Sequence, residues 1–390
     1  MMFLTIGATV ALLALPVAAQ TTQPAAAPAN TAQDGCAQET RDALYKTFTD
    51  SRTADQKKAY DSAKKYLACP VATPTESQTK IIEYLTRWVG LYEKGERKNR
   101  FTDELYNKKN YVEAFKIGGE ILKDEPDNTK VMVDLGANGY LVGPLNNASL
   151  TAEAVEYARR ALAAVEGGKT VDDWTPLQNK DVAVAYLNYT IGSLTVEKDP
   201  SGALKYLLKS AQFETPLKKS AFTYALIAGA YETGPYAKQA EAYKIYKDKE
   251  ETPESKLALA NIHQLVDRMI DGYARAVALA GSDAKLATQK TAWKESLKTW
   301  YKFRNPNDPE TAMDTLVAGI LTKPLPPEPT PLTSLPPTPT TTSGTPAPGT
   351  STGTTGAGNG ATTPAKPAST PTPTPASANS KPEPPKKPRQ

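Results

Sequence analysis

Residues able to do chemistry are few and scattered in this chain of 390 residues. The single histidine, His263, lies in the stretch LALANIHQLVDRM, without a nucleophile at a suitable spacing, an HExxH pair or a Cys/His metal set. We therefore expect a partly buried imidazole on a helix. The run Asp172-Asp173-Trp174 is the one suggestion of a glycosidase carboxylate pair, and an acidic pair preceding a helix explains it better. The sequence predicts no catalytic residue, no metal and no cofactor.

The two cysteines predict a structural disulfide. Cys36 precedes one predicted helix, and Cys69 ends the next, immediately before Pro70. Antiparallel helices bring such ends together, and a bridge closing a loop of roughly 34 residues would contribute on the order of 4 kcal/mol in the chain-entropy model. The alternative is two thiols. A disulfide would fit an oxidising compartment, and the absence of a CxxC spacing argues against a redox role.

The beginning of the chain predicts export. Residues 3–17 form a short apolar run, and Val17-Ala18-Ala19 supplies the small residues that a signal peptidase reads. We interpret residues 1–19 as a signal peptide cleaved after Ala19 and residues 20–35 as a flexible linker, which predicts a periplasmic or secreted protein of bacterial origin. Because no Lys or Arg precedes the apolar run, a membrane anchor at the N-terminus is the alternative.

The end of the chain has a different composition from the rest. Residues 323–390 hold 19 of the 33 prolines and consist mainly of Pro, Thr, Ser, Ala and Gly, so we predict a disordered tail. The tail also carries the net charge of +4, because the remainder has 40 basic and 40 acidic residues. A neutral remainder argues against nucleic-acid binding. The basic end, KPEPPKKPRQ, could associate with an anionic envelope or cell-wall surface.

Between these ends, the sequence of residues 36–322 predicts helices. Apolar residues return every three or four positions, and no strand pattern occurs. Thr-Pro and Asp-Pro pairs mark expected helix starts, since the first residue can cap the helix and proline fits its first position. These pairs are Thr73-Pro74, Thr175-Pro176, Asp199-Pro200, Thr215-Pro216, Thr252-Pro253 and Asp308-Pro309. The expected helices include 111–123, 151–166, 201–212, 237–247, 254–280, 283–303 and 310–321, with an earlier hairpin over 39–68.

The spacing of apolar and small residues resembles the tetratricopeptide repeat (TPR) family over roughly residues 95–250. Tyr224, Ile227, Ala228 and Tyr231 match the four signature positions of a first helix. Other matches are Leu135-Gly136 and Ile191-Gly192 as Leu-Gly pairs, with Ala114, Ala154, Ala203 and Ala240 or Ala242 as second-helix alanines and Pro126 as a terminal proline. The resemblance implies an all-α fold, a right-handed superhelix of stacked antiparallel helical hairpins, with irregular spacing between hairpins.

The same resemblance implies where a partner would bind. In this family the first helices line a concave groove, and the corresponding residues here are Asn99, Asp103, Tyr106, Lys130, Tyr140, Tyr186, Tyr189 and Ser193. The Lys/Asn clamp that some members use for peptide carboxylates is absent. We therefore expect a non-enzymatic exported scaffold that binds a protein or peptide partner. The alternative is a carbohydrate-binding or carbohydrate-cleaving envelope protein that uses tyrosines to stack on sugar rings.

Overall fold

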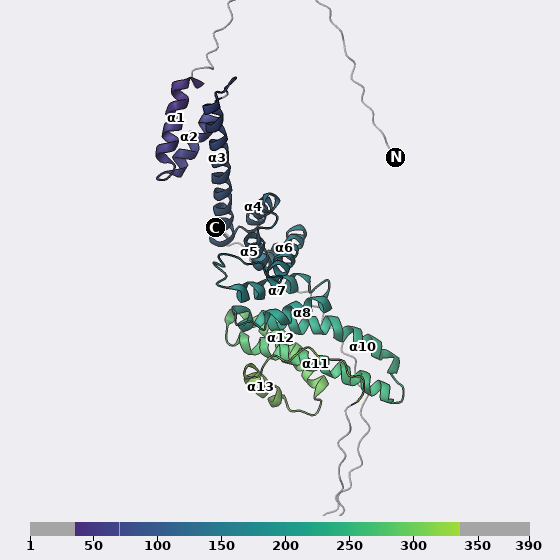
Figure 1. Cartoon of the computed structure of the whole chain (residues 1–390). Helices are drawn as coiled ribbons and strands as arrows, with labels where there is room; N and C mark the ends of the chain where they lie inside the picture. The colour runs from purple at the N-terminus through teal and green to yellow at the C-terminus, as the bar shows by residue number, and fades with distance from the viewer. Residues whose placement is uncertain (1–35, 70, 336–390) are drawn as a thin grey trace, which may run out of the picture. The chain divides into compact units, whose positions relative to one another are not determined.

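The structure is a computed structural model that describes residues 36–69 and 71–335, and these residues form helices and connecting loops without a strand (Figure 1). The sequence-predicted all-α class is confirmed. The predicted signal peptide, linker and most of the predicted tail lie outside the described residues. The α-helices are α1 (Gln38–Ser51), α2 (Gln56–Leu67), α3 (Glu76–Thr102), α4 (Tyr111–Asp124), α5 (Thr129–Asn138), α6 (Ala148–Glu166), α7 (Lys180–Thr195), α8 (Pro200–Ser210), α9 (Ala221–Tyr231), α10 (Ala237–Tyr243), α11 (Pro253–Ala280), α12 (Ala287–Arg304) and α13 (Glu310–Gly319).

Shorter helical turns extend several of these helices. Two are π-helical, η2 (Asp103–Asn107) after α3 and η5 (Glu232–Tyr236) between α9 and α10. The 3₁₀ turns are η3 (Gly139–Leu145), η4 (Pro216–Lys219), η6 (Lys244–Tyr246), η7 (Ala284–Leu286) and η8 (Ile320–Thr322). Each sequence-predicted helix corresponds to an observed one, with ends that differ by a few residues.

The predicted proline-marked starts are correct at only two of six places. Asp199 accepts a hydrogen bond from the Gly202 amide at the start of α8, and Thr252 forms a reciprocal capping box with Ser255 at the start of α11. The other pairs do not cap an α-helix. Thr75 caps α3 instead of Thr73, Asn179 caps α7 instead of Thr175, Thr215-Pro216 opens a 3₁₀ turn without a side-chain cap, and Asp308 accepts a hydrogen bond from Tyr301.

The apolar side chains of the described residues form three clusters. One joins α1, α2 and the first half of α3 around Phe48 and Leu85. A second extends from the end of α3, at Phe101, through α7, and a third extends from α7 to α13. Helix α7 contributes Leu187 to the second cluster and Tyr189 to the third, so it is buried on two faces.

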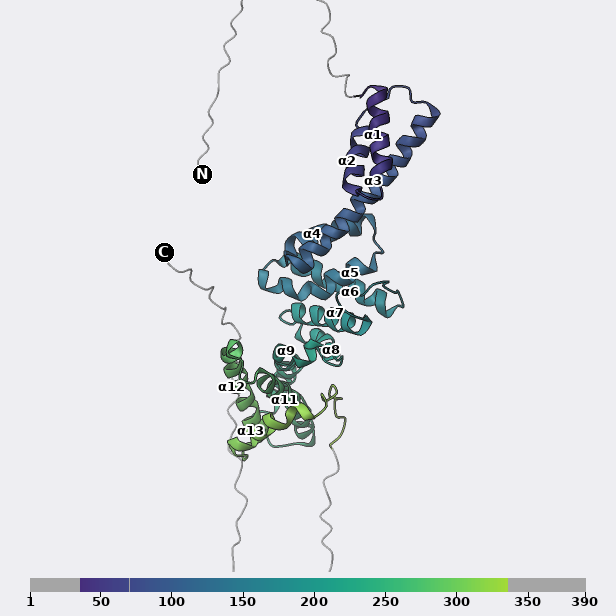
Figure 2. The same cartoon turned by 90° about the vertical axis from the view of Figure 1, so that its left-hand side faces the viewer.

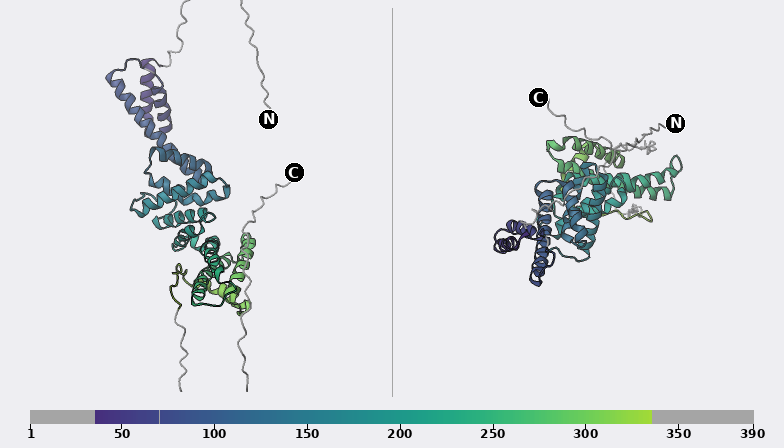
Figure 3. Two further views of the ribbon diagram at one scale, coloured as in Figure 1. Left: turned by 90° about the vertical axis from the view of Figure 1, so that its right-hand side faces the viewer. Right: turned by 90° about the horizontal axis from the view of Figure 1, so that it is seen from above.

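Each helix packs mainly on its neighbours in the chain. Successive pairs from α1·α2 to α8·α9 are in contact, α5 also contacts α7, and α11 contacts α9, α10, α12 and α13. In Figure 3 (left), α3 extends from the α1–α2 pair to α4. Most contacts are therefore local in sequence, and each hairpin buries its apolar face against the next.

Two glycines permit close contacts between α-helices. A Cβ atom at Gly136 in α5 would lie 2.7 Å from the Ala158 Cα of α6, and one at Gly192 in α7 would lie 2.7 Å from Leu207 of α8. Distances this short are prohibited for real carbon atoms. These are the two glycines of the Leu-Gly pairs seen in the sequence, and their role is to let neighbouring helices approach.

The predicted start of the disordered tail is too early. Residues 323–335, which we call the strap, lie along α11, and Leu325 packs against the third apolar cluster. In Figure 2 the strap is the yellow-green segment that follows α13. The prediction of disorder rested on low apolar content alone, whereas hydrogen bonds between α11 side chains and the strap backbone hold much of the strap. Residues 336–390 lie outside the described residues.

The two cysteines lie close together, as the hairpin geometry predicts. Both are partly exposed thiols in this structure. A hydrogen bond with the Cys36 side chain, followed by burial, raises the pKa of the Cys69 thiol. The disulfide remains a prediction, and the proximity of the two side chains is the condition that it requires.

Candidate functional site

Two of the predicted groove residues, Tyr106 and Lys130, meet at a buried carboxylate. The Lys130 ammonium donates to both oxygens of Asp134, each at 2.7 Å, and to the Thr175 carbonyl at 2.8 Å. The Tyr106 hydroxyl donates to Asp134 Oδ1 at 2.9 Å. The Asn138 amide donates to the Tyr106 oxygen at 3.3 Å and to the Asp134 carbonyl at 2.8 Å. We call Tyr106, Lys130, Asp134 and Asn138 the α5 polar cluster.

Burial dominates the electrostatics of the α5 polar cluster. Asp134 is 3% exposed, and burial raises the pKa of its carboxyl against the opposing effects of Lys130 and Tyr106. Burial and the neighbouring Asp134 charge also raise the pKa of the Tyr106 hydroxyl, which therefore remains protonated at physiological pH. The cluster satisfies its own polar groups, which is the condition for burying a charge without a large cost.

Three other predicted residues form a tyrosine cluster. The Tyr140 ring centroid lies 5.9 Å from that of Tyr186 and 5.4 Å from that of Tyr189, with an edge-on contact to Tyr189. Tyr189 is buried, whereas Tyr140 and Tyr186 are partly exposed. Burial raises the pKa of Tyr140 to about 12. The cluster thus offers two partly exposed aromatic side chains that contact each other, and the buried Tyr189 packs against one of them, Tyr140.

The remaining predicted groove residues do not join either cluster. Asn99 is exposed and donates to Glu96 one turn earlier on α3. Asp103 pairs with Lys108 at 2.8 Å and accepts from Asn107, and these contacts lower the pKa of its carboxyl. Ser193 is partly buried and donates to the Thr190 carbonyl at 3.4 Å.

The candidate catalytic residues His263 and Asp173 make contacts that belong to the fold. His263 is partly buried on α11 and contacts the Phe303 ring edge-on, with centroids 6.0 Å apart. Asp173 accepts from the Thr175 amide at 2.8 Å in the loop before α7, whose start is several residues further on. The expected explanation, an acidic pair at a helix start, is therefore wrong, because Asp173 closes a turn of that loop.

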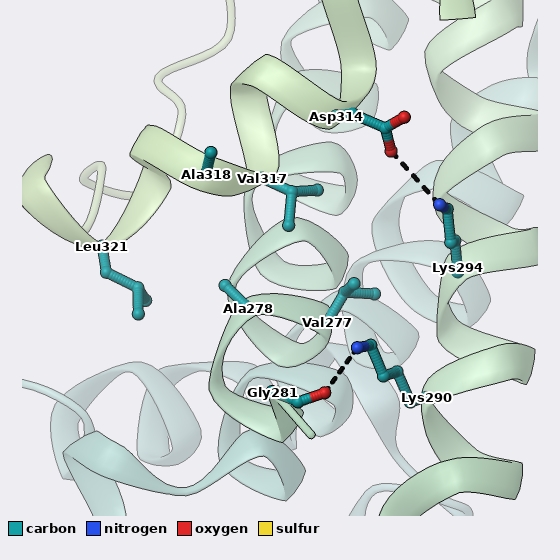
Figure 4. A pocket seen from close by; sticks show the side chains of 9 residues that line it. All are labelled: Val277, Ala278, Gly281, Lys290, Lys294, Asp314, Val317, Ala318 and Leu321. Atoms are coloured by element: carbon teal, nitrogen blue, oxygen red, sulfur yellow. Dashed lines mark hydrogen bonds and ion pairs between the residues drawn. The ribbon is translucent and has the colours of Figure 1, made fainter. Parts of the chain in front are cut away.

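One cleft of the described chain already contains an ion pair and a hydrogen bond of its own. It has a volume of about 390 Å³ and lies between α11, α12 and the α13–η8 end (Figure 4). Lys294 pairs with Asp314 at 3.2 Å across it, and Lys290 donates to the Gly281 carbonyl at 2.5 Å. Apolar side chains, including Val277, Val317 and Leu321, form the rest of its lining. Every charged group drawn in Figure 4 has a partner within the chain.

Neither a metal site nor a membrane span is found within residues 36–69 and 71–335. This part of the chain contains no group of three His, Cys, Asp or Glu side chains arranged to hold a metal ion. In the same ranges, none of the helices is both long enough and apolar enough to cross a membrane. No family model matches the chain, and no match is found to a curated protein or to a solved structure.

Sequence reasoning missed Asp134 and Asn138, although a signal for them existed. They follow Lys130 at four-residue intervals, which places all three side chains on one face of α5. It also missed Asn261, Arg268 and Arg275, which repeat at seven-residue intervals along α11 and contact the strap. In both cases the spacing was readable, but no motif drew attention to it.

Proposed function

We propose that this chain is a non-enzymatic, exported scaffold of the TPR type that binds a protein or peptide partner. The observation that carries the proposal is the tyrosine cluster, since Tyr140 and Tyr186 are partly exposed at positions where the family resemblance places a groove. Partly exposed, fixed tyrosines give a partner a large contact area at a small entropic cost.

The packing of the signature residues supports the repeat interpretation. Tyr224, Ile227, Ala228 and Tyr231 are all buried, and so are the proposed second-helix alanines Ala114, Ala154 and Ala203. The contact of α5 with α7 also agrees with first helices that pack on each other in succession. The match fails at α10, which buries no residue and leaves Ala242 exposed. We therefore restrict the proposed repeats to the region before α10.

The α5 polar cluster has a supporting role in this proposal. Lys130 and Tyr106 use their polar groups on Asp134, so they hold the surface in shape instead of offering free donors. The proposed partner contacts are consequently Tyr140 and Tyr186. Export rests on the signal-like residues 1–19, with the N-terminal membrane anchor as the alternative, and the basic tail remains a proposed contact with the envelope or cell wall.

The test is site-specific photo-crosslinking in the producing cell. A photoreactive residue at Tyr186 should capture a defined partner, and one at the exposed Glu156 of α6 should not. The same captured species from both positions, or none from Tyr186, would contradict the proposal. If Tyr186→Ala removes binding of a glycan while no protein is captured, the carbohydrate-binding alternative replaces it.

A further inference from the structure

A face of α11 binds an extended part of the same chain. Asn261, Arg268 and Arg275 lie seven residues apart, which is nearly two helical turns, so they project from one side of the helix at intervals of about 10 Å. Each side chain contacts the backbone of the strap, and the order of contacts shows that the strap runs antiparallel to α11. The face is therefore a row of polar groups that matches a stretched peptide.

The deepest contact is made by Arg275. Its side chain is 5% exposed, pairs with Asp271 at 2.7 Å and lies over the ring of Tyr224. The guanidinium Nη2 donates to the carbonyl oxygens of Lys323 at 2.9 Å and of Pro324 at 2.8 Å. The buried guanidinium of Arg275 is therefore held in position to bind two backbone carbonyls.

The other two contacts also recognise backbone. Arg268 Nε donates to the Pro327 carbonyl at 2.7 Å. The Asn261 side-chain amide makes a two-point contact with Leu332, because its Nδ2 donates to the Leu332 carbonyl at 3.1 Å and its Oδ1 accepts from the Leu332 amide at 2.6 Å. These bonds are independent of the side chains of the peptide, and they require only an extended chain with free carbonyls.

The buried positions of the strap follow the period of polyproline II. Pro326, Pro329 and Leu332 are partly buried at three-residue intervals, and Leu325 is partly buried as well. The positions between them are exposed. Polyproline II has three residues per turn and no internal hydrogen bonds, so one edge can face α11 while every carbonyl is available to a donor. The strap thus combines apolar contacts at a fixed period with backbone recognition.

The strap sequence occurs a second time in the tail. Residues 325–330 read LPPEPT, and residues 335–340 read LPPTPT, ten positions later. The repeat keeps the leucine and the prolines that correspond to Leu325, Pro326 and Pro329, while Thr342 replaces Leu332. The chain therefore contains a binding face on α11 and two similar segments, of which one occupies that face.

We propose that this face of α11 is a binding site for extended proline-rich peptides of the form Leu-Pro-Pro-x-Pro-Thr, and that the strap occupies it as an internal ligand. The site is separate from the tyrosine cluster and does not depend on the proposed TPR-type function. No strap residue is fully buried, and Leu325 is the strap residue that packs against the third apolar cluster, so departure of the strap removes little apolar contact. A partner peptide of this sequence then competes with the strap for Asn261, Arg268 and Arg275.

The test compares the full-length wild type with a full-length variant whose strap is weakened, Leu325→Lys with Leu332→Lys. The probe is a fluorescent synthetic peptide of residues 323–335, followed by anisotropy. The weakened variant should bind the peptide at least about tenfold more tightly than wild type, because the internal ligand no longer fills the site. A second variant, Pro326→Gly with Pro329→Gly, keeps both leucines and should give the same result.

The matched control distinguishes binding at this site from nonspecific binding. Asn261→Asp, added to the weakened variant, removes the Nδ2 donor and should abolish peptide binding, whereas Asn307→Asp at an exposed loop position should not. A peptide of residues 333–345 should bind more weakly, because threonine replaces Leu332, and a scrambled peptide should not bind.

Equal binding by wild type and both weakened variants, or equal loss with Asn261→Asp and Asn307→Asp, would overturn the proposal. Concentration-dependent dimers in light scattering that disappear with Asn261→Asp would support the same site with the tail of a second copy as the occupant.

Discussion

The α5 polar cluster and the α11 face each contain a row of polar side chains on one side of a helix, but the hydrogen-bond partners of the two rows differ. In the α5 polar cluster, Lys130, Asp134 and Tyr106 bond to one another. On α11, Arg268 and Asn261 bond to the backbone of the strap, which follows the last α-helix of the described chain.

This difference separates stability from binding. A network that satisfies itself leaves no group for a ligand, and its loss exposes a buried charge, so it belongs to the fold. A row that is satisfied by a detachable segment leaves donors and acceptors available as soon as the segment departs. The α11 face therefore has the properties of a binding site, whereas the α5 polar cluster has those of a structural element.

The largest effect should come from adding a methyl group between α5 and α6. Gly136→Ala places a methyl group 2.7 Å from the backbone of Ala158, which cannot move without separating α5 from α6, so we expect a loss of about 2–3 kcal/mol in unfolding free energy. Gly95→Ala is the control, because nothing lies within 4 Å of its exposed position on α3, and it should gain up to about 1 kcal/mol. Urea unfolding measures both, and equal effects would show that α5 and α6 are not closely packed.

Removing the carboxylate of the α5 polar cluster should cost nearly as much. Asp134→Ala leaves Lys130 and Tyr106 without their shared acceptor, and because Lys130 is partly exposed we expect a loss of about 2 kcal/mol. The double variant with Lys130→Met should recover part of that loss. If Asp134→Ala has no effect on the urea midpoint, the cluster does not contribute to the fold as argued.

The strap should contribute less than the α5 polar cluster. A chain that ends after Leu335 should melt like the full chain, whereas one that ends after Thr322 should lose about 1–2 kcal/mol, since it removes several hydrogen bonds and the partial burial of Leu325 and Leu332. Melting curves of the three lengths test this. Loss of folding on ending at Thr322 would place the strap in the fold and weaken the case for exchange.

The features of the fold differ in how well the sequence predicted them. Helical periodicity was sufficient to predict the all-α class and the approximate positions of the helices whose bounds were predicted, because burial of a three- and four-residue stripe is a local property. The glycines of the Leu-Gly pairs were equally readable, and both lie at close helix contacts. Helix caps were less predictable. Asn179 caps α7 in place of Thr175, and the Asp308 carboxylate accepts a hydrogen bond from Tyr301.

The strap was not predictable from composition. The rule that low apolar content means disorder does not include backbone carbonyls, and those carbonyls are what Arg268 and Arg275 recognise. The α5 polar cluster was not predicted, for a related reason. Lys130 was identified as a ligand contact, but its charge is neutralised by Asp134, and this partner was visible only as a four-residue spacing. Interactions between distant segments or of backbone atoms leave weak sequence signals.

The histidine of α11 should give a small pH effect near the strap-binding row. Burial, with the nearby Arg304 charge, lowers the pKa of His263 below its ordinary value of 6.5. The unfolded chain then binds a proton more readily, so this contribution to stability is present above about pH 6.5 and is lost as the pH falls towards the folded pKa. His263→Gln should reduce the decrease in melting temperature between about pH 7.5 and 5. An identical decrease in the variant would show that other groups cause it.

The last comparison uses two tyrosines, Tyr106 of the α5 polar cluster and Tyr231 on α9. The Tyr106 hydroxyl donates to Asp134, so Tyr106→Phe should cost about 1–2 kcal/mol. Tyr231 on α9 is 1% exposed, and its hydroxyl has no hydrogen-bond partner among the described residues. Tyr231→Phe should therefore be neutral or stabilising by up to about 1 kcal/mol, because it removes a buried polar atom that gains nothing from the fold. Equal losses in the two variants, measured by urea unfolding, would mean that the Tyr231 hydroxyl has a hydrogen-bond partner.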